Sequence, residues 1–129
     1  MSDVRAIVAG HGDFGAGLVS AVAQITGRGE LFVALSNRDM SAQDVERAMR
    51  DLSLPGVAVI FTDLPAGSCT MAARRLMRER PDLLLVTGTN LATLLDFVFS
   101  DGVPVGEAVR HAVEKGKAAL VVTGAPSGH

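Results

Sequence analysis

The sequence predicts a single α/β domain with a doubly wound, mainly parallel sheet covered by helices on both faces. Short apolar runs alternate along the chain with stretches of helical period. Most of these runs are apolar on both faces, as expected of strands buried between two helical layers. The 129 residues suffice for one domain with a real core but not for two ordinary domains. We therefore expect one domain over residues 1–129, with a loose tail at 124–129.

Five apolar runs are the expected strands. In chain order they are Val4–Ala9, Leu31–Leu35, Val57–Phe61, Leu83–Thr87 and Ala119–Thr123. The helical stretches between the first four have about the length that right-handed crossovers between parallel strands require.

The expected helices alternate with these strands. They cover Phe14–Ile25, Ser41–Leu52, Ser68–Arg80, Asn90–Phe99 and Val105–Lys117. Ser41 and Ser68 are the expected N-caps of their helices, since a serine hydroxyl can accept a hydrogen bond from a free first-turn amide. The fourth helix has an apolar face that needs burial against the sheet or another chain. That face consists of Leu91, Leu94, Leu95 and Val98.

The composition excludes several classes of function. Hydrophobic residues make up 48% of the chain and the net charge is -2, which argues against disorder and against a basic nucleic-acid surface. The absence of Trp and Tyr weakens any recognition by stacking. No run approaches the roughly 20 apolar residues that cross a bilayer, and no targeting segment precedes the domain, so we expect a cytoplasmic protein. A lone cysteine, Cys69, excludes an internal disulfide, and we expect neither a metal nor a cofactor.

The most informative feature is a histidine between two glycines, Gly10-His11-Gly12, where the first strand ends and the first helix begins. The carboxyl end of a parallel strand opens onto the crevice where such folds bind ligands, and a helix N-terminus attracts anions there. His11 could hold or pass on an anion at that position. His111, on an amphipathic helix, and His129, in the tail, are expected to be exposed bystanders.

A second loop of the same design follows the third strand, from Thr62 to Ser68. In a sheet of order 2-1-3-4, the loops after strands one and three line one crevice, so Asp63 would face His11. A carboxylate that accepts a hydrogen bond from Nδ1 leaves the lone pair of Nε2 free as a nucleophile. Amides near Gly67 and Ser68, with the Ser68 hydroxyl, could then stabilise a phosphoryl group on that nitrogen.

These segments resemble the mannose-type enzyme IIA components of the bacterial phosphoenolpyruvate-dependent sugar phosphotransferase system. The likeness rests on Ile7–Gly12 with Gly17-Leu18, on Phe61–Ser68 with Ala72-Ala73, and on Val86–Leu91. Their order and spacing match over nearly the whole chain, and the galactosamine-type members are the most similar. One departure is Ala66-Gly67-Ser68-Cys69, where the family usually has Gly-Gly before Ser or Thr and then Pro.

The resemblance implies a phosphocarrier. Phospho-HPr would give its phosphoryl group to His11, with Asp63 orienting the ring and Gly12, Gly67 and Ser68 binding the group, and an enzyme IIB partner would receive it. The resemblance also implies a homodimer, a 2-1-3-4 parallel sheet, a terminal antiparallel strand at Ala119–Thr123, and contact with the membrane only through the permease. The sugar cannot be predicted, because this subunit would not touch it.

Three alternatives compete with this interpretation. The first is a related phosphocarrier subunit of a dihydroxyacetone kinase, or a regulatory phosphoprotein. The second is a nucleotide-binding module, because Gly10 to Gly15 is a literal G-x-G-x-x-G after a strand; however, Ser36-Asn37-Arg38 stands where the ribose-binding acid belongs. The third is a cysteine phosphatase, because Cys69 to Arg75 has the C-x5-R spacing, although that stretch favours a helix.

Overall fold

The computed structural model describes residues 3–125 and contains a four-stranded parallel sheet in the order β2-β1-β3-β4. The strands are β1 (Ala6–Gly10), β2 (Phe32–Ser36), β3 (Val59–Thr62) and β4 (Leu84–Val86). This order confirms the predicted sheet. Each strand lies within about two residues of its expected bounds, which is the usual uncertainty of an element's ends.

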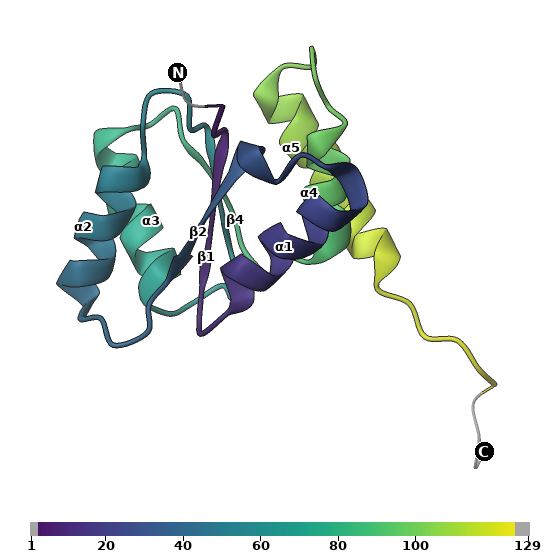
Figure 1. Ribbon diagram of the computed structural model, residues 1–129, viewed down its shortest axis with the longest axis horizontal. Coiled ribbons are helices and arrows are strands. Elements are labelled where there is room, and N and C mark those ends of the chain that lie inside the picture. Colours follow the sequence, from purple (N-terminus) through teal and green to yellow (C-terminus); the bar gives the residue numbers. More distant parts are fainter. Residues whose placement is uncertain (1–2, 126–129) are drawn as a thin grey trace.

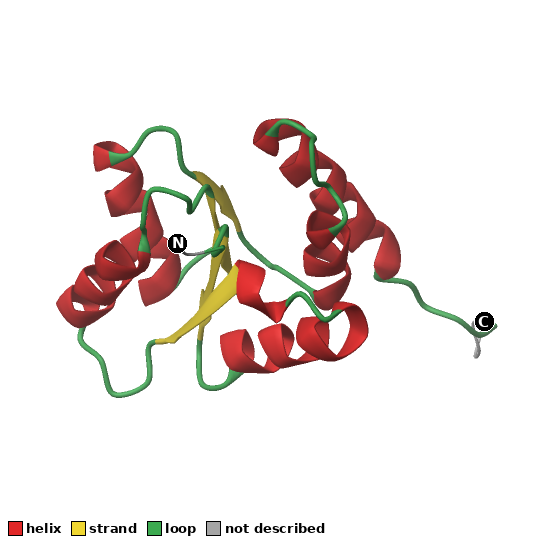
Figure 2. Cartoon of the chain, turned by 45° about the horizontal axis from the view of Figure 1, so that its top comes forward, coloured by secondary structure: helices red, strands yellow, loops and turns green. Residues whose placement is uncertain are grey.

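Helices cover both faces of the sheet, as predicted. They are α1 (Phe14–Thr26), α2 (Ala42–Leu52), α3 (Ser68–Glu79), α4 (Leu91–Val98) and α5 (Val105–Ala119), and a short 3-10 turn, η1 (Gly29–Leu31), leads into β2. Figures 1 and 2 show α2 and α3 on one side of the sheet and α1, α4 and α5 on the other.

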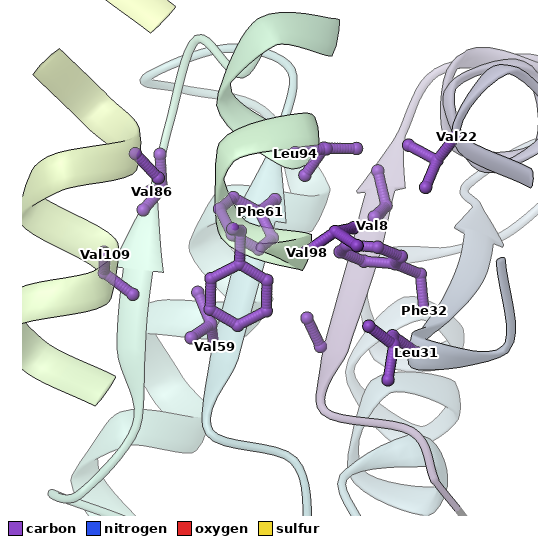
Figure 3. Packing of buried hydrophobic residues seen from close by; sticks show 13 residues of the cluster. Val8, Val22, Leu31, Phe32, Val59, Phe61, Val86, Leu94, Val98 and Val109 are labelled. Carbon is purple, nitrogen blue, oxygen red and sulfur yellow. The ribbon is translucent and has the colours of Figure 1, made fainter. Parts of the chain in front are cut away.

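Each face of the sheet has its own hydrophobic core. On the face covered by α1, α4 and α5, Phe32 and Phe61 point toward the helices, as Figure 3 shows. Phe61 meets Phe97 of α4 edge-on, with 5.4 Å between ring centroids. On the face covered by α2 and α3, the side chains of Ile7 and Ile60 are fully buried. The continuous burial of β1 and β3 explains why their sequences are apolar without alternation.

Of the two predicted N-cap residues, Ser41 and Ser68, the structure confirms one. Ser41 caps α2 in a reciprocal capping box with Asp44, which confirms that prediction. The prediction that Ser68 caps α3 is wrong by one position: Gly67 is the N-cap and Ser68 is the first helical residue. Gly67 has φ of 111°, a conformation that glycine adopts without strain, and it turns the chain into the helix without a side-chain cap.

The apolar face of α4 is covered by the chain itself. Leu94 and Val98 are buried, and Leu91 and Leu95 pack partly buried against the same core. This face therefore does not require a second chain.

The terminal antiparallel strand expected at Ala119–Thr123 does not form within the chain. The helix α5 continues to Ala119, and the next residues lead away from the body of the molecule (Figure 1). Leu120, Val121 and Val122 are 85%, 73% and 96% exposed. A strand needs an edge to pair with, and although β4 is an edge strand, this segment leads away from it. The expected tail at 124–129 reaches beyond the described residues, and His129 lies outside them.

No helix within residues 3–125 is both long enough and apolar enough to cross a membrane.

Candidate functional site

The candidate site lies at the carboxyl edge of the sheet, between the two central strands. β1 and β3 are hydrogen-bonded neighbours, but β1 continues into α1 on one face and β3 continues into α3 on the other. The two loops therefore diverge at the switch point of the sheet, the position at which doubly wound sheets have their ligand-binding crevice. His11 comes from the first loop and Asp63 from the second.

The structure brings His11 and Asp63 into direct contact. The Nδ1 atom of His11 lies 2.7 Å from Oδ2 of Asp63, and the backbone N–H of His11 donates to the same oxygen at 2.9 Å. The carboxylate side chain is 13% exposed, whereas the imidazole is 57% exposed. One oxygen thus fixes both the backbone and the ring of His11, while most of the ring remains accessible.

The charge of Asp63 is maintained by this contact. Partial burial acts to raise the pKa of Asp63, but the hydrogen bonds from the ring and backbone of His11, with the charge of the ring, hold that pKa below its ordinary value. Asp63 is therefore ionised at neutral pH and accepts the Nδ1 hydrogen. Nε2 of His11 is then the ring nitrogen with the lone pair.

Close packing requires glycine at two positions of the first loop and helix. A Cβ on Gly10 would stand 2.7 Å from Oδ2 of Asp63 and 2.8 Å from the ring of Phe14, so only glycine allows the carboxylate to reach His11. A Cβ on Gly15 would collide with the carbonyl oxygen of Val8, where α1 packs against β1. Packing therefore explains both Gly10 and Gly15, so the G-x-G-x-x-G pattern no longer indicates a nucleotide-binding site.

The other predicted residues lie on or next to the two loops that carry His11 and Asp63. Gly12 adopts a left-handed conformation with φ of 52° directly after His11. On the opposite loop, a Cβ at Gly67 would lie 3.5 Å from Cε1 of His11, so the backbone of Gly67 lies close to the ring. Ser68 follows at the start of α3, where the first amides have no acceptor within the helix.

The loop after β2 contributes residues that the sequence analysis did not assign to the site. The amide of the Asn37 side chain donates to Oγ of Ser68 at 2.9 Å. Arg38 forms an ion pair with Asp13, with 3.1 Å between Nη2 and Oδ1. The sequence offers one signal for them, since both residues directly follow a strand adjacent to β1.

Cys69 has no features of a catalytic thiolate. Burial and the nearby Asp63 charge raise its pKa to about 11, and the residue is 1% exposed. The stretch from Cys69 to Arg75 lies within α3 and does not form a loop around an anion. The cysteine phosphatase alternative is therefore wrong.

A second histidine–carboxylate pair lies far from this crevice. His111 Nδ1 is 2.7 Å from Oδ2 of Asp96, beside a cavity of about 300 Å³ that Phe99 and Glu107 also line. His111 is exposed as predicted, but it has a partner. The carboxylates of Asp96 and Glu107 make this cavity acidic and unsuited to a phosphoryl group. Among residues 3–125, no three His, Cys, Asp or Glu side chains are placed to hold a metal ion.

The chain is similar to known proteins in sequence and in fold. The sequence matches the family model EIIA-man, described as PTS system fructose IIA component, over residues 5–115. Among solved structures, phosphotransferase system component EIIA from Streptococcus agalactiae is similar, with TM-score 0.80, 25% identity and coverage of 92% of this chain and 96% of that chain. The mannose/sorbose specific IIA subunit from Enterococcus faecalis has TM-score 0.80, 20% identity and 98% coverage of each chain.

A further similar structure is the PTS IIA protein associated with the fucose utilization operon of Streptococcus pneumoniae. Its TM-score is 0.75 at 19% identity, with 95% of this chain and 96% of that chain covered. No curated protein matches the sequence at a significant level.

Proposed function

The chain belongs to the EIIA-man family of sugar phosphotransferase system IIA components, and from this premise we propose that it is a phosphocarrier. It accepts a phosphoryl group from phospho-HPr on His11 and passes it to an enzyme IIB partner for coupled sugar uptake. The observation that carries the proposal is the 2.7 Å contact between His11 Nδ1 and Asp63 Oδ2 at the switch point of the sheet. The protein contacts the membrane only indirectly, through the permease.

The contact makes Nε2 of His11 the nucleophile. Nδ1 keeps its hydrogen and donates it in a hydrogen bond to Asp63. The lone pair of Nε2 therefore attacks the phosphorus of phospho-HPr. The new N–P bond forms as the bond to the donor breaks, and the donor keeps the electron pair of the broken bond. Asp63 stabilises the positive charge that develops on the ring. The same steps in reverse, with enzyme IIB as acceptor, return His11 to its starting state.

Gly12, Gly67 and Ser68 are the proposed phosphoryl-binding residues. The approach of the Gly67 backbone to Cε1 of His11 and the free amides at the start of α3 favour an anion beside the ring. Helix N-termini carry partial positive charge, so this arrangement lowers the free energy of a phosphoryl group without a metal ion.

We also propose that two copies form a homodimer. Leu120, Val121 and Val122 extend from α5 with large exposed apolar area, which is unusual for a segment free in solution. An apolar groove of about 600 Å³ lies between β4 and α5, lined by Leu85, Val86, Val109 and Val113 among others. β4 is an edge strand with an unpaired side. The expected strand at 119–123 would find its partner on this edge in the second copy.

Light scattering at micromolar concentration tests the dimer. The full chain is expected at twice the monomer mass, and Val121→Asp should shift it toward the monomer because it adds a charge to a segment that the dimer would bury. A wild-type monomer would contradict the assembly without affecting the assignment of His11.

Phosphorylation from phosphoenolpyruvate, enzyme I and HPr tests the phosphocarrier function. Intact mass should show one added phosphoryl group, labile in acid and stable in base, which leaves when the enzyme IIB partner is added. His11→Ala should remove the label, and His111→Ala, which alters the other paired histidine, should keep it. Labelling of His11→Ala would show that another residue is the acceptor.

A further inference from the structure

Arg38 is the only Lys or Arg in the four loops at the carboxyl edge of the sheet. These loops cover residues 11–13, 37–41, 63–67 and 87–90. The same loops carry three carboxylates, Asp13, Asp39 and Asp63. A phosphoryl group on His11 would bring further negative charge to an edge that is already acidic.

Local hydrogen bonds hold the loop of Arg38 beside the loop that carries His11. The backbone N–H of Asn37 donates to the carbonyl of Gly10 at 3.2 Å, and that of Arg38 donates to Oγ of Ser36 at 3.1 Å. The guanidinium reaches over the first loop, where its Nη2 lies 3.4 Å from the point at which a Cβ on Gly12 would stand. Arg38 therefore lies next to the residue that follows His11.

The present partner of Arg38 holds it only weakly. Asp13 Oδ1 is 3.1 Å from Nη2, but the two side chains are 84% and 58% exposed. Exposed ion pairs contribute little because water screens them. A phosphoryl group carries more charge than one carboxylate and offers oxygens that a guanidinium fork can bind in pairs. A phosphoryl group at the crevice would thus compete well with Asp13.

We propose that Arg38 binds the phosphoryl group on His11, exchanging its ion pair with Asp13 for phosphoryl oxygens. This inference rests on the proposed phosphocarrier function and adds a residue to it. Asp13 keeps the guanidinium above the first loop while His11 is free. When His11 is phosphorylated, Arg38 supplies the one full positive charge that the four loops contain.

The neighbouring Asn37 connects the same loop to the opposite side of the crevice. Its Nδ2 donates to Oγ of Ser68, which uses a lone pair of the serine hydroxyl. The Ser68 hydroxyl then keeps its hydrogen as the one it can donate to a phosphoryl oxygen. The loop after β2 thereby fixes Arg38 on one side and orients Ser68 on the other.

The position of the phosphoryl equilibrium tests this role. Wild type, Arg38→Met, Arg38→Lys and Asp13→Asn are mixed with phospho-HPr, and the fraction phosphorylated on each protein is measured by intact mass. Arg38→Met should lower the equilibrium constant for acceptance roughly tenfold or more, since it removes a charge-assisted hydrogen bond. Arg38→Lys should restore part of it, and Asp13→Asn should raise it by freeing the guanidinium and removing a negative charge.

Arg28→Met is the matched control, because Arg28 is also partly exposed and paired with a nearby acid, Glu30, but lies at the opposite edge of the sheet. It should behave as wild type. The ³¹P chemical shift of the phosphohistidine should change in Arg38→Met and not in Arg28→Met, which a purely structural role would not produce.

Equal equilibrium constants for Arg38→Met and Arg28→Met would overturn the inference, as would a lowered constant in Asp13→Asn. Either result leaves the assignment of His11 intact. A wild-type protein that phospho-HPr does not label would instead refute the phosphocarrier function, and this inference with it.

Discussion

Replacing Asp63 by asparagine tests how the carboxylate activates His11. Asparagine has almost the same shape, and its Oδ1 can replace the oxygen that accepts from both the ring and the backbone of His11. The substitution therefore removes the negative charge and keeps the geometry. We expect the fold to persist and phosphoryl transfer to slow.

The size of the effect follows from the two hydrogen bonds. The backbone bond, at 2.9 Å, is the same before and during transfer, so making it to a neutral oxygen changes the rate little. The ring bond, at 2.7 Å, strengthens as positive charge develops on the imidazole. A hydrogen bond to a charged group contributes about 1.5–3 kcal/mol. Asparagine keeps the bond but accepts it with a neutral oxygen, so the transition state loses only the excess over a neutral hydrogen bond, about 1–2 kcal/mol, which slows transfer roughly 5- to 30-fold.

Rapid-quench measurement of transfer from phospho-HPr gives this rate, and thermal unfolding monitors the fold. Asp96→Asn makes the same chemical change at the other histidine pair, which has the same 2.7 Å contact, and should transfer at the wild-type rate. A wild-type rate in Asp63→Asn, with an unchanged melting temperature, would refute the activating role and reduce Asp63 to a structural hydrogen-bond acceptor.

Three further predictions concern the surroundings of the pair. Gly10→Ala should abolish labelling by phospho-HPr and lower the unfolding free energy by about 1–3 kcal/mol, because its Cβ would meet Asp63 Oδ2 at 2.7 Å. Gly17→Ala, with open space around its Cβ, is the control and should not destabilise; equal behaviour of the two would contradict the steric argument. Cys69→Ser should keep most phosphoryl acceptance. Iodoacetamide at pH 8 should label wild-type Cys69 slowly until urea unfolds the protein, because the pKa of the buried thiol is raised to about 11. Rapid labelling of the native protein would be inconsistent with this burial. Because the folded-state pKa of Asp63 is lowered, its contribution to stability is present above its unfolded pKa of about 3.9 and is lost as pH falls through the folded value. The melting temperature of Asp63→Asn should therefore fall less steeply with acid than that of wild type, and parallel curves would refute the coupling.

Most of the fold could be predicted from the sequence, because the apolar patterns and capping residues that determine its elements are local and periodic. β1 and β3 are apolar on both faces, as a sheet covered by helices on both sides requires. Ser41 has a hydroxyl that can accept a hydrogen bond from a first-turn amide, as an N-cap residue must. The meeting of His11 and Asp63 followed from topology, because the loops after adjacent strands of opposite crossover share one crevice.

The remaining features depend on contacts that leave no pattern in the sequence. The direction in which Arg38 and Asn37 reach is set by the conformation of an irregular loop, and no periodicity reports it. The positive φ of Gly67 moved the N-cap of α3 by one residue, which composition alone does not reveal. The strand expected at Ala119–Thr123 needs an unpaired edge within reach, but α5 continues to Ala119 and the residues after it lead away from the free edge of β4.

The nitrogen that carries the phosphoryl group is the most direct test of the central claim. The contact of Nδ1 with Asp63 leaves Nε2 as the nucleophile, so the phosphorylated protein must carry its phosphoryl group on Nε2 of His11. Protein with ¹⁵N-labelled histidine, phosphorylated by phospho-HPr, distinguishes the two ring nitrogens by NMR. We predict an N–P bond at Nε2 of His11 with Nδ1 still protonated. A phosphoryl group on Nδ1, or on His111, would contradict the account.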